Sequence, residues 1–342
     1  MSGRKPVVYY TRKAPDPAKD LLAPFCELIE PDEHREFSKK ELIHGARTSD
    51  ALCCFVTDII DEEIIESCPE LKIISLAGRG FDNIDVHAAT TRNVWVTNAV
   101  ESVEPTADLT WALLLGIARR VNSADSFVRS GRFSGWVHPS PFYGSLVTGR
   151  TLGIIGMGQL GIAIARRARG FDMTVLYYDS YRYDGTLDVK YNMTALPRDE
   201  VLKRSDFVCL ASPLTEQTFH QISRRELSLM KPTAYLVNPS RGSEVDEQAV
   251  AEALASGRLA GYAADVYEME DLRFPQRPAY IDQDLIRLSD RTIFTPHLGT
   301  AIPEVRREIM KTQALNVLQA LRGEKPAGAI NRVHPPRPLA AE

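Results

Sequence analysis

A short apolar run that leads into a glycine-rich turn constrains the fold of this chain more than any other feature. Residues 151–161 have the sequence TLGIIGMGQLG, and a helix-compatible run, 162–171, follows. In such a pattern the first glycine permits a tight turn, the second lets the backbone approach a pyrophosphate, and the third lets helix and strand pack closely. The pattern therefore predicts a strand–turn–helix unit that binds a dinucleotide through Gly156, Gly158, Gln159, Leu160 and Gly161.

An acidic residue at the end of the next apolar run indicates which dinucleotide is bound. The run 173–178 ends in Asp179, about twenty residues beyond the glycines. A carboxylate there accepts hydrogen bonds from the adenosine ribose and repels a 2′-phosphate, so we predict NAD rather than NADP. Arg182 could neutralise such a phosphate, which leaves the strictness of this preference open. The alternative interpretation of the glycine pattern is an ordinary α/β turn without a ligand.

Composition excludes several classes of protein. A chain of 342 residues is long enough for about two domains, and its 44% hydrophobic and 25% charged residues are typical of soluble globular proteins. The net charge of -4 gives no indication of a nucleic-acid or membrane partner. The five cysteines have no metal-ligand spacing, and no apolar run resembles an export signal or a membrane span. We therefore expect a cytoplasmic protein with reduced thiols and no metal site.

The remaining pattern predicts two α/β units. Apolar runs alternate with helix-like segments before the glycine motif, which indicates a helix-covered parallel sheet; the predicted strands are 7–10, 26–29, 51–56, 72–77 and 94–97. A helix is predicted to begin near Thr106, the region 123–150 is rich in loop residues, and the strands expected after the glycine motif are 173–178, 207–211, 234–237, 261–265 and 292–294.

The last predicted helix, 303–321, follows the final strand of the nucleotide unit and could return the chain to the first unit. We predict an α/β protein with a Rossmann-type doubly wound parallel sheet over residues 104–299. A flavodoxin-like α/β substrate domain, discontinuous in sequence, would comprise residues 1–103 and 300–342. Two domains joined by two helices would leave a cleft between them, and ligands favour such clefts.

Three polar residues follow three different predicted strands of the nucleotide unit. Arg241, Glu270 and His297 come after the strands near 234–237, 261–265 and 292–294. The carboxyl ends of parallel strands open on one edge of a sheet, so we expect these side chains to converge beside the nucleotide. Histidine can exchange the proton that accompanies hydride transfer, a carboxylate can fix its tautomer, and an arginine fork matches a carboxylate or a phosphorus oxyanion.

Each of these residues has a less specific interpretation when taken alone. Arg241 could be a solvated loop residue, Glu270 could belong to a wetted acidic cluster, and His297 could be a turn histidine. Their joint placement after a nucleotide-binding motif favours a dehydrogenase.

Several motifs resemble those of the D-2-hydroxyacid dehydrogenase family. They are the glycine motif, RGS at 241–243, GYAADV at 261–266, TPHLG at 295–299 and GFDNID at 80–85, and the resemblance covers roughly residues 7 to 333. It implies that Arg241, Glu270 and His297 form the catalytic trio and that the Arg79–Gly80 turn offers backbone N–H groups to the substrate anion. It also implies a homodimer built through the nucleotide domain and further cofactor contacts at Thr106, Pro213, Asp265 and Gly299.

Within the family, segments 262–271, 127–131 and 142–144 are most similar to the phosphite (phosphonate) dehydrogenases. By this resemblance Trp136 and Tyr143 wall the substrate pocket. The departures fall in the substrate lobe, where Arg79 stands in place of a substrate-binding lysine and Val56 in place of a pocket methionine. Because arginine and lysine differ in reach and geometry, the type of reaction is better determined than the substrate.

We therefore expect an NAD-dependent dehydrogenase that transfers hydride between nicotinamide and a small anion held by Arg79 and Arg241. Phosphite, oxidised to phosphate, is the substrate that the resemblance favours. The alternative is a D-2-hydroxy acid or its 2-oxo partner, such as glyoxylate, hydroxypyruvate or a phosphonate-bearing analogue. A third hypothesis is an NAD(H)-sensing binding protein similar to corepressor relatives, against which the intact trio argues.

Overall fold

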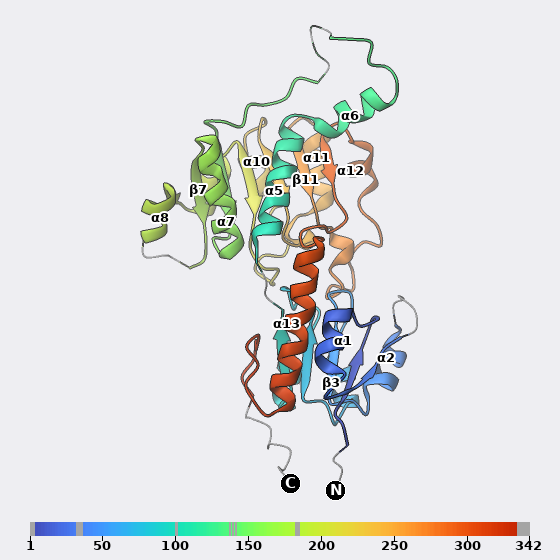
Figure 1. Cartoon of the computed structure of the whole chain (residues 1–342). Helices are drawn as coiled ribbons and strands as arrows, with labels where there is room; N and C mark the ends of the chain where they lie inside the picture. Colours follow the sequence, from blue (N-terminus) through green and yellow to red (C-terminus); the bar gives the residue numbers. More distant parts are fainter. Residues whose placement is uncertain are drawn as a thin grey trace. The chain divides into compact units, whose positions relative to one another are not determined.

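The computed structural model describes residues 4–31, 37–99, 102–136, 138, 140, 142–181 and 185–333, and the chain divides into two compact units (Figure 1). Unit 1 comprises Met1–Ser102 with Ile302–Glu342, and unit 2 comprises Val103–Ala301. None of the described helices is long and apolar enough to cross a membrane. The five cysteines are buried and free.

Unit 1 is built on a parallel sheet that, among the described residues, has five strands in the order β2-β1-β3-β4-β5. These are β1 (Val7–Tyr10), β2 (Glu27–Ile29), β3 (Ala51–Cys54), β4 (Ile73–Leu76) and β5 (Trp95–Asn98). The order is that of the flavodoxin-like fold. One face packs on α1 (Asp16–Leu22) and α13 (Pro303–Leu321), the other on α2 (Lys39–Ala46), α3 (Glu62–Ser67) and α4 (Val86–Thr91). Burial on both faces explains why β1, β3 and β4 are almost uniformly apolar.

Helix α13 belongs to unit 1 although about two hundred residues separate it from β5. Its buried Gln313 donates hydrogen bonds to the carbonyls of Cys54 (3.2 Å) and Ser75 (2.7 Å), at the ends of β3 and β4. These bonds attach α13 to the carboxyl-terminal parts of β3 and β4. The unit is therefore discontinuous in sequence, as predicted.

Unit 2 contains a parallel sheet whose strands, within the described ranges, follow the order β12-β11-β10-β9-β6-β7-β8. They are β6 (Thr151–Ile155), β7 (Thr174–Tyr178), β8 (Met193–Ala195), β9 (Phe207–Leu210), β10 (Tyr235–Asn238), β11 (Gly261–Ala264) and β12 (Thr292–Phe294). The order reverses between β6 and β9, which is the topological switch point at which doubly wound sheets bind nucleotides. This confirms the predicted Rossmann-type fold.

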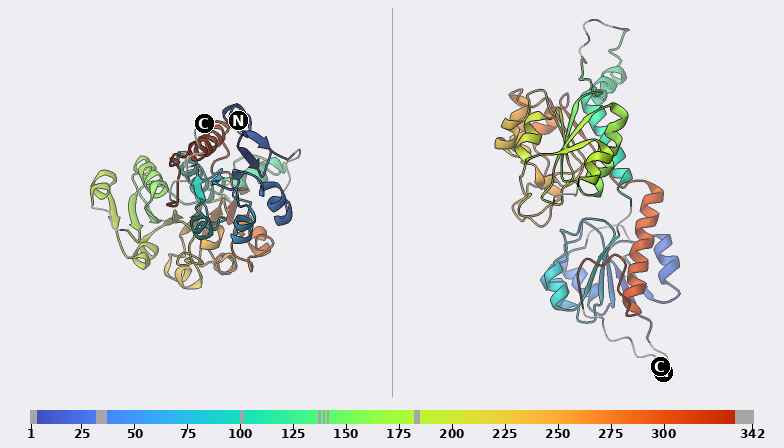
Figure 2. Two further views of the ribbon diagram at one scale, coloured as in Figure 1. Left: turned by 90° about the horizontal axis from the view of Figure 1, so that it is seen from below. Right: turned by 90° about the vertical axis from the view of Figure 1, so that its left-hand side faces the viewer.

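Helices cover both faces of the unit 2 sheet (Figure 2). One core joins the sheet to α5 (Glu104–Ala118) and α7 (Gln159–Ala168). The other joins it to α9 (Arg198–Arg204), α10 (Arg224–Leu229), α11 (Glu247–Ala255) and α12 (Gln283–Arg287). The described residues of this unit also form three short 3-10 turns: η1 (Arg169–Phe171), η2 (Gly242–Glu244) and η3 (Glu268–Glu270).

Two regions differ from the prediction. The region expected to be loop-rich begins with α6 (Val121–Arg129), a helix that buries no residue and contains asparagine, serine and aspartate, which favour turns over helix interiors. Strand β8 and its neighbour α8 (Thr186–Tyr191) were also not predicted. Two of the three residues of β8 are exposed, so this edge strand has little apolar pattern.

Candidate active site

The glycine-rich turn between β6 and α7 has the shape that a pyrophosphate requires. Gly156 has a φ of +95°, and a Cβ there would lie 2.6 Å from the Ala211 carbonyl carbon. A Cβ on Gly161 would lie 2.3 Å from the Gly156 oxygen, whereas one on Gly158 would meet no atom within 4 Å. Close packing thus explains why Gly156 and Gly161 are glycines. Gly158 faces open space at the N-terminus of α7, where backbone N–H groups favour an anion.

The residues that begin α7 and end β7 complete this nucleotide site. Gln159 is exposed and Leu160 packs on the core beneath the turn. Asp179 follows β7 directly, and its two carboxylate oxygens accept hydrogen bonds from the backbone N–H of Met157 (2.5 Å) and Tyr181 (2.7 Å). Asp179 therefore links the glycine turn to the end of β7. Together, the glycine turn and this carboxylate fit NAD. Arg182 lies outside the described residues.

Asp265, at the end of β11, organises the turn that bears His297. It is 1% exposed, and its Oδ2 accepts the backbone N–H of Gly299 (2.9 Å). Its Oδ1 accepts the Leu298 N–H (2.7 Å), and its main-chain carbonyl accepts the His297 N–H (2.9 Å). These bonds hold His297 in a left-handed conformation, with a φ of +54°. Such a conformation persists where the surroundings over-determine it, as at functional sites.

The other predicted cofactor contacts lie near strand ends of the same unit. Thr106, in the first turn of α5, donates from Oγ1 to the Gly299 carbonyl at 3.2 Å. Pro213 is exposed after β9, and its carbonyl accepts a hydrogen bond from Thr218 Oγ1 at 2.7 Å. Thr106, Gly299 and Asp265 thus form one contact group.

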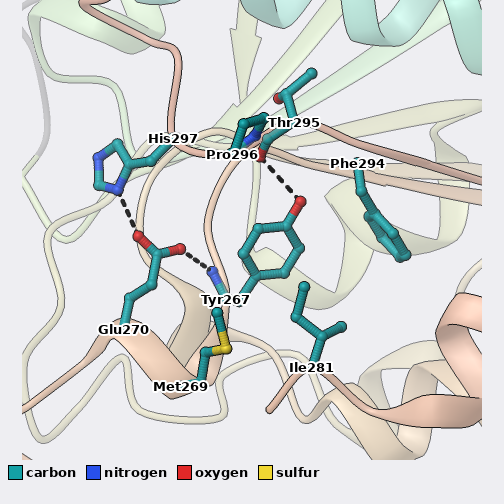
Figure 3. A pocket seen from close by; sticks show the side chains of 8 residues that line it. All are labelled: Tyr267, Met269, Glu270, Ile281, Phe294, Thr295, Pro296 and His297. Carbon is teal, nitrogen blue, oxygen red and sulfur yellow. Dashed lines mark hydrogen bonds and ion pairs between the residues drawn. The ribbon is translucent and has the colours of Figure 1, made fainter.

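His297 and Glu270 point toward one another beside the Tyr267 turn (Figure 3). His297 Nδ1 lies 2.6 Å from Glu270 Oε2, and Glu270 Oε1 accepts the Tyr267 N–H at 2.8 Å. Both carboxylate oxygens are therefore engaged, which orients the imidazole. Among the described residues, Nε2 of His297 has no hydrogen-bond partner, so it is the ring nitrogen available to a substrate. The side chain is 41% exposed.

The Arg241 turn packs directly against the turn that bears Glu270. A Cβ on Gly242 would lie 1.8 Å from the Tyr267 carbonyl carbon, and the Ser243 N–H donates to the buried Asp271 carboxylate at 2.6 Å. Arg241 itself donates from Nη1 to the Ser240 carbonyl at 2.9 Å. The structure thus brings His297 and Glu270 into contact and places Arg241 on the adjoining turn, after the neighbouring strand of the sheet.

A cavity of about 430 Å³ opens beside the His297–Glu270 pair (Figure 3). Its walls are mainly apolar, and His297, Glu270 and Thr295 are among the polar residues that line it. The lining residues are Tyr267, Met269, Glu270, Ile281, Phe294, Thr295, Pro296 and His297. An apolar cavity with a few polar groups is typical of a small-molecule site.

Sequence reasoning missed a buried carboxyl group three residues after Arg241. Glu244 is fully buried, and this burial raises its pKa to about 7, although hydrogen bonds from Ser212 and Gln221 oppose the shift. The carboxyl thereby joins the Arg241 turn to the loop that follows β9. In the sequence, only the position of Glu244 three residues after Arg241 could have indicated that it belongs to the site.

In unit 1, the predicted substrate contacts Arg79 and Gly80 follow β4. The Arg79 carbonyl accepts a hydrogen bond from Asn98 Nδ2 (2.8 Å), and partial burial lowers the pKa of the guanidinium. Burial also lowers the pKa of half-buried Arg306, near the start of α13. Within the described part of the chain, no carboxylate pairs with Arg306. Sequence reasoning did not single out this arginine, which is a further candidate for contact with an anion.

Trp136 and Tyr143, the predicted pocket walls, are exposed in unit 2, at 86% and 62%. Trp136 stacks on His138 with a centroid distance of 5.9 Å, and the Tyr143 hydroxyl lies 3.2 Å from His138 Nδ1. Their role at the substrate remains a prediction.

Known proteins resemble this chain in sequence and in fold. Residues 111–299 match the family model for the D-isomer specific 2-hydroxyacid dehydrogenase, NAD binding domain. The glyoxylate reductases of Korarchaeum cryptofilum and Pyrococcus furiosus are 41% and 40% identical to the chain, over 97% and 96% of its length and 99% and 96% of theirs. The crystal structure of a glyoxylate reductase from Paecilomyes thermophila is 26% identical, with a TM-score of 0.84 over 96% of this chain and 99% of that one.

These names bear on the predicted substrate. They favour the 2-hydroxy acid and 2-oxo acid alternative, and they do not support the phosphite dehydrogenase resemblance.

Proposed function

Because this chain belongs to the D-isomer specific 2-hydroxyacid dehydrogenase family and is an NAD-dependent oxidoreductase, we propose that it reduces glyoxylate, or a closely related 2-oxo acid, to the 2-hydroxy acid. The observation that supports this most directly is the His297–Glu270 contact, which leaves Nε2 available on a rigid turn. The similarity of this chain to glyoxylate reductases, which extends over nearly its whole length, supports the choice of substrate.

The proposed mechanism assigns one role to each group of the trio. The glycine turn and Asp179 would hold NADH, which when bound would supply the hydride for the carbonyl carbon of the substrate. Arg241 binds the substrate carboxylate, since a guanidinium fork matches two carboxylate oxygens. With Nδ1–H bound to Glu270, the protonated His297 ring holds its second proton at Nε2, and this proton passes to the carbonyl oxygen. Proton and hydride together convert the 2-oxo acid to the 2-hydroxy acid.

The other predicted site residues contact the substrate or the cofactor. Arg79 and Gly80 bind the substrate anion, and Trp136 and Tyr143 restrict the size of its substituent. The glycine turn, Asp179, Thr106, Pro213 and Gly299 bind NAD. The enzyme is a cytoplasmic homodimer that associates through unit 2, where apolar residues of α6 such as Val121 and Val128 are exposed.

The test is a panel of substrates whose turnover is monitored through the absorbance of NADH. Glyoxylate, hydroxypyruvate and a phosphonate-bearing 2-oxo acid are assayed with NADH, and glycolate and phosphite with NAD. Turnover of glyoxylate with a kcat/KM above that of the other compounds is the expected result. Oxidation of phosphite without reduction of any 2-oxo acid would refute the proposal. Absence of turnover together with NADH-dependent binding of a protein partner would favour the corepressor-like hypothesis.

Substitution of Asp179 by serine is expected to raise the KM for NADH about 10- to 100-fold. The reason is that hydrogen bonds to a charged acceptor contribute about 1.5–3 kcal/mol. The preference for NADH over NADPH should narrow, because the charge that repels a 2′-phosphate is removed. Steady-state kinetics with both cofactors test this, with exposed Asp284→Asn as the control. A wild-type enzyme that prefers NADPH would contradict the assignment.

Substitution of Arg79 by glutamine is expected to raise the KM for glyoxylate by about tenfold or more, because a charged donor to the carboxylate is lost. The dissociation constant for NADH should not change. Initial-rate kinetics and fluorescence titration of NADH separate the two effects, and Arg92→Gln on the exposed end of α4 serves as the control. An unchanged KM for glyoxylate would remove Arg79 from the proposed substrate contacts.

A further inference from the structure

A second histidine–glutamate pair involves the same short turn as the first. Glu268 and Glu270 both lie in η3, and Glu268 Oε2 is 2.9 Å from His220 Nε2. The side chains of this second pair are 12% and 32% exposed, so they are less exposed than Glu270 and His297, at 28% and 41%. One turn of three residues thus contacts a different histidine through each of its two glutamates.

Glu268 is also fixed to the start of α11. Its backbone N–H donates to Glu247 Oε1 at 2.9 Å, and its own Oε1 accepts the Glu247 N–H at 2.8 Å. Glu247 is 3% exposed, and burial raises the pKa of this carboxyl to about 7. With Oε2 engaged by His220, every polar atom of the Glu268 carboxylate is used to hold the turn in place.

His220 lies on a segment that contacts both turns of the proposed site. Its backbone N–H donates to the Ser243 carbonyl at 2.8 Å, in the turn after Arg241, and its φ is +47°. The ring stacks on Phe219 with a centroid distance of 4.1 Å. The next residue, Gln221, donates to the buried carboxyl of Glu244. Segment 219–221 therefore braces the Arg241 turn through its backbone and the Glu270 turn through the His220 ring.

We propose that His220 is a positioning residue for the reaction: its pair with Glu268 holds the Tyr267–Glu270 turn so that Glu270 presents its carboxylate to His297. The inference rests on the proposed function, because its kinetic readout is the reduction of a 2-oxo acid. Misplacement of a reacting group by about 1 Å can cost about 10²-fold in rate, so a contact two residues from Glu270 can control the rate without touching substrate.

The charge of this pair depends on pH. The groups facing His220 are Glu268 in η3 and Asp246 and Glu247 at the start of α11, and Arg224 of α10 lies 3.7 Å from Asp246. The hydrogen bond to Glu268 is the main cause that raises the pKa of His220, while burial opposes it. His220 is therefore fully protonated below the ordinary histidine pKa of about 6.5. Its stabilisation is lost as pH rises through the raised pKa.

Two substitutions separate the charge of His220 from its hydrogen bond. His220→Ala removes both, and we expect kcat to fall about 10- to 100-fold per folded molecule, with the KM for glyoxylate near that of the wild type. His220→Gln can place an uncharged donor near the position of Nε2 and should recover most of kcat. The ratio of wild-type to His220→Gln kcat should be largest at low pH and fall as pH rises.

The control is His87→Gln, an exposed histidine of α4 in unit 1, which should match the wild type throughout. Folded fractions are measured by circular dichroism. An unchanged kcat and pH profile in His220→Ala would overturn the inference, as would a loss that follows only the folded fraction. An NMR titration of His220 needs no turnover: its pKa should lie above the ordinary value and fall in Glu268→Gln. An unchanged pKa in Glu268→Gln overturns the inference, whereas wild-type inactivity on every 2-oxo acid contradicts the proposed function instead.

Discussion

Replacement of His297 by asparagine is expected to lower the kcat for glyoxylate reduction by about 10²–10⁴-fold, which is the usual contribution of general acid–base catalysis. Asparagine has no group at the position of Nε2 to transfer a proton, although its amide nitrogen can take the position of Nδ1 beside Glu270. The binding of NADH should persist, because the glycine turn and Asp179 lie elsewhere in unit 2. Single-turnover rates and fluorescence titration of NADH measure the two quantities.

The companion substitution is Glu270→Gln, which keeps an acceptor for Nδ1–H but removes the charge. It should therefore cost less than the loss of His297. The control is His44→Gln, an exposed histidine of α2. If the His297→Asn variant had the same kcat as the wild type, another group would have to donate the proton. That result would contradict the proposed mechanism.

Substitution of Gly242 by alanine is expected to destabilise unit 2 and to reduce kcat by about 10²-fold or more. The added Cβ would lie 1.8 Å from the carbonyl carbon of Tyr267 and 2.3 Å from the Glu268 nitrogen. Both are backbone atoms, so the Arg241 and Glu270 turns must separate. Overpacking costs about 1–3 kcal/mol even where side chains can yield, and a shift of about 1 Å at the site accounts for the rate.

Gly170→Ala is the matched control, since a Cβ there would meet no atom within 4 Å. Thermal unfolding should show a lower Tm for Gly242→Ala only, and the kcat of the folded protein should fall in the same variant. If Gly242→Ala kept the wild-type Tm and kcat, the close packing of the two turns could not be what aligns Arg241 with Glu270.

Much of the fold could be predicted because its signals are local. The runs that form β1 and β12 were predicted with the bounds that the structure shows, as was α13. Strand β8 and helix α6 were missed because they bury few side chains, and burial is what imposes an apolar pattern on a sequence. Predicting the turn 295–299 from its motif did not reveal that the buried carboxylate of Asp265 builds it.

The sequence by itself determined the glycine turn, the acid after β7 and the strand ends that bear Arg241, Glu270 and His297, since these depend on spacing along a few residues. Only the tertiary structure decided which charged groups meet. The His297–Glu270 and His220–Glu268 contacts join residues 27 and 48 positions apart. Such pairs depend on how closely the turns that bear them pack. The Arg241 and Glu270 turns can pack closely because Gly242 has no Cβ atom.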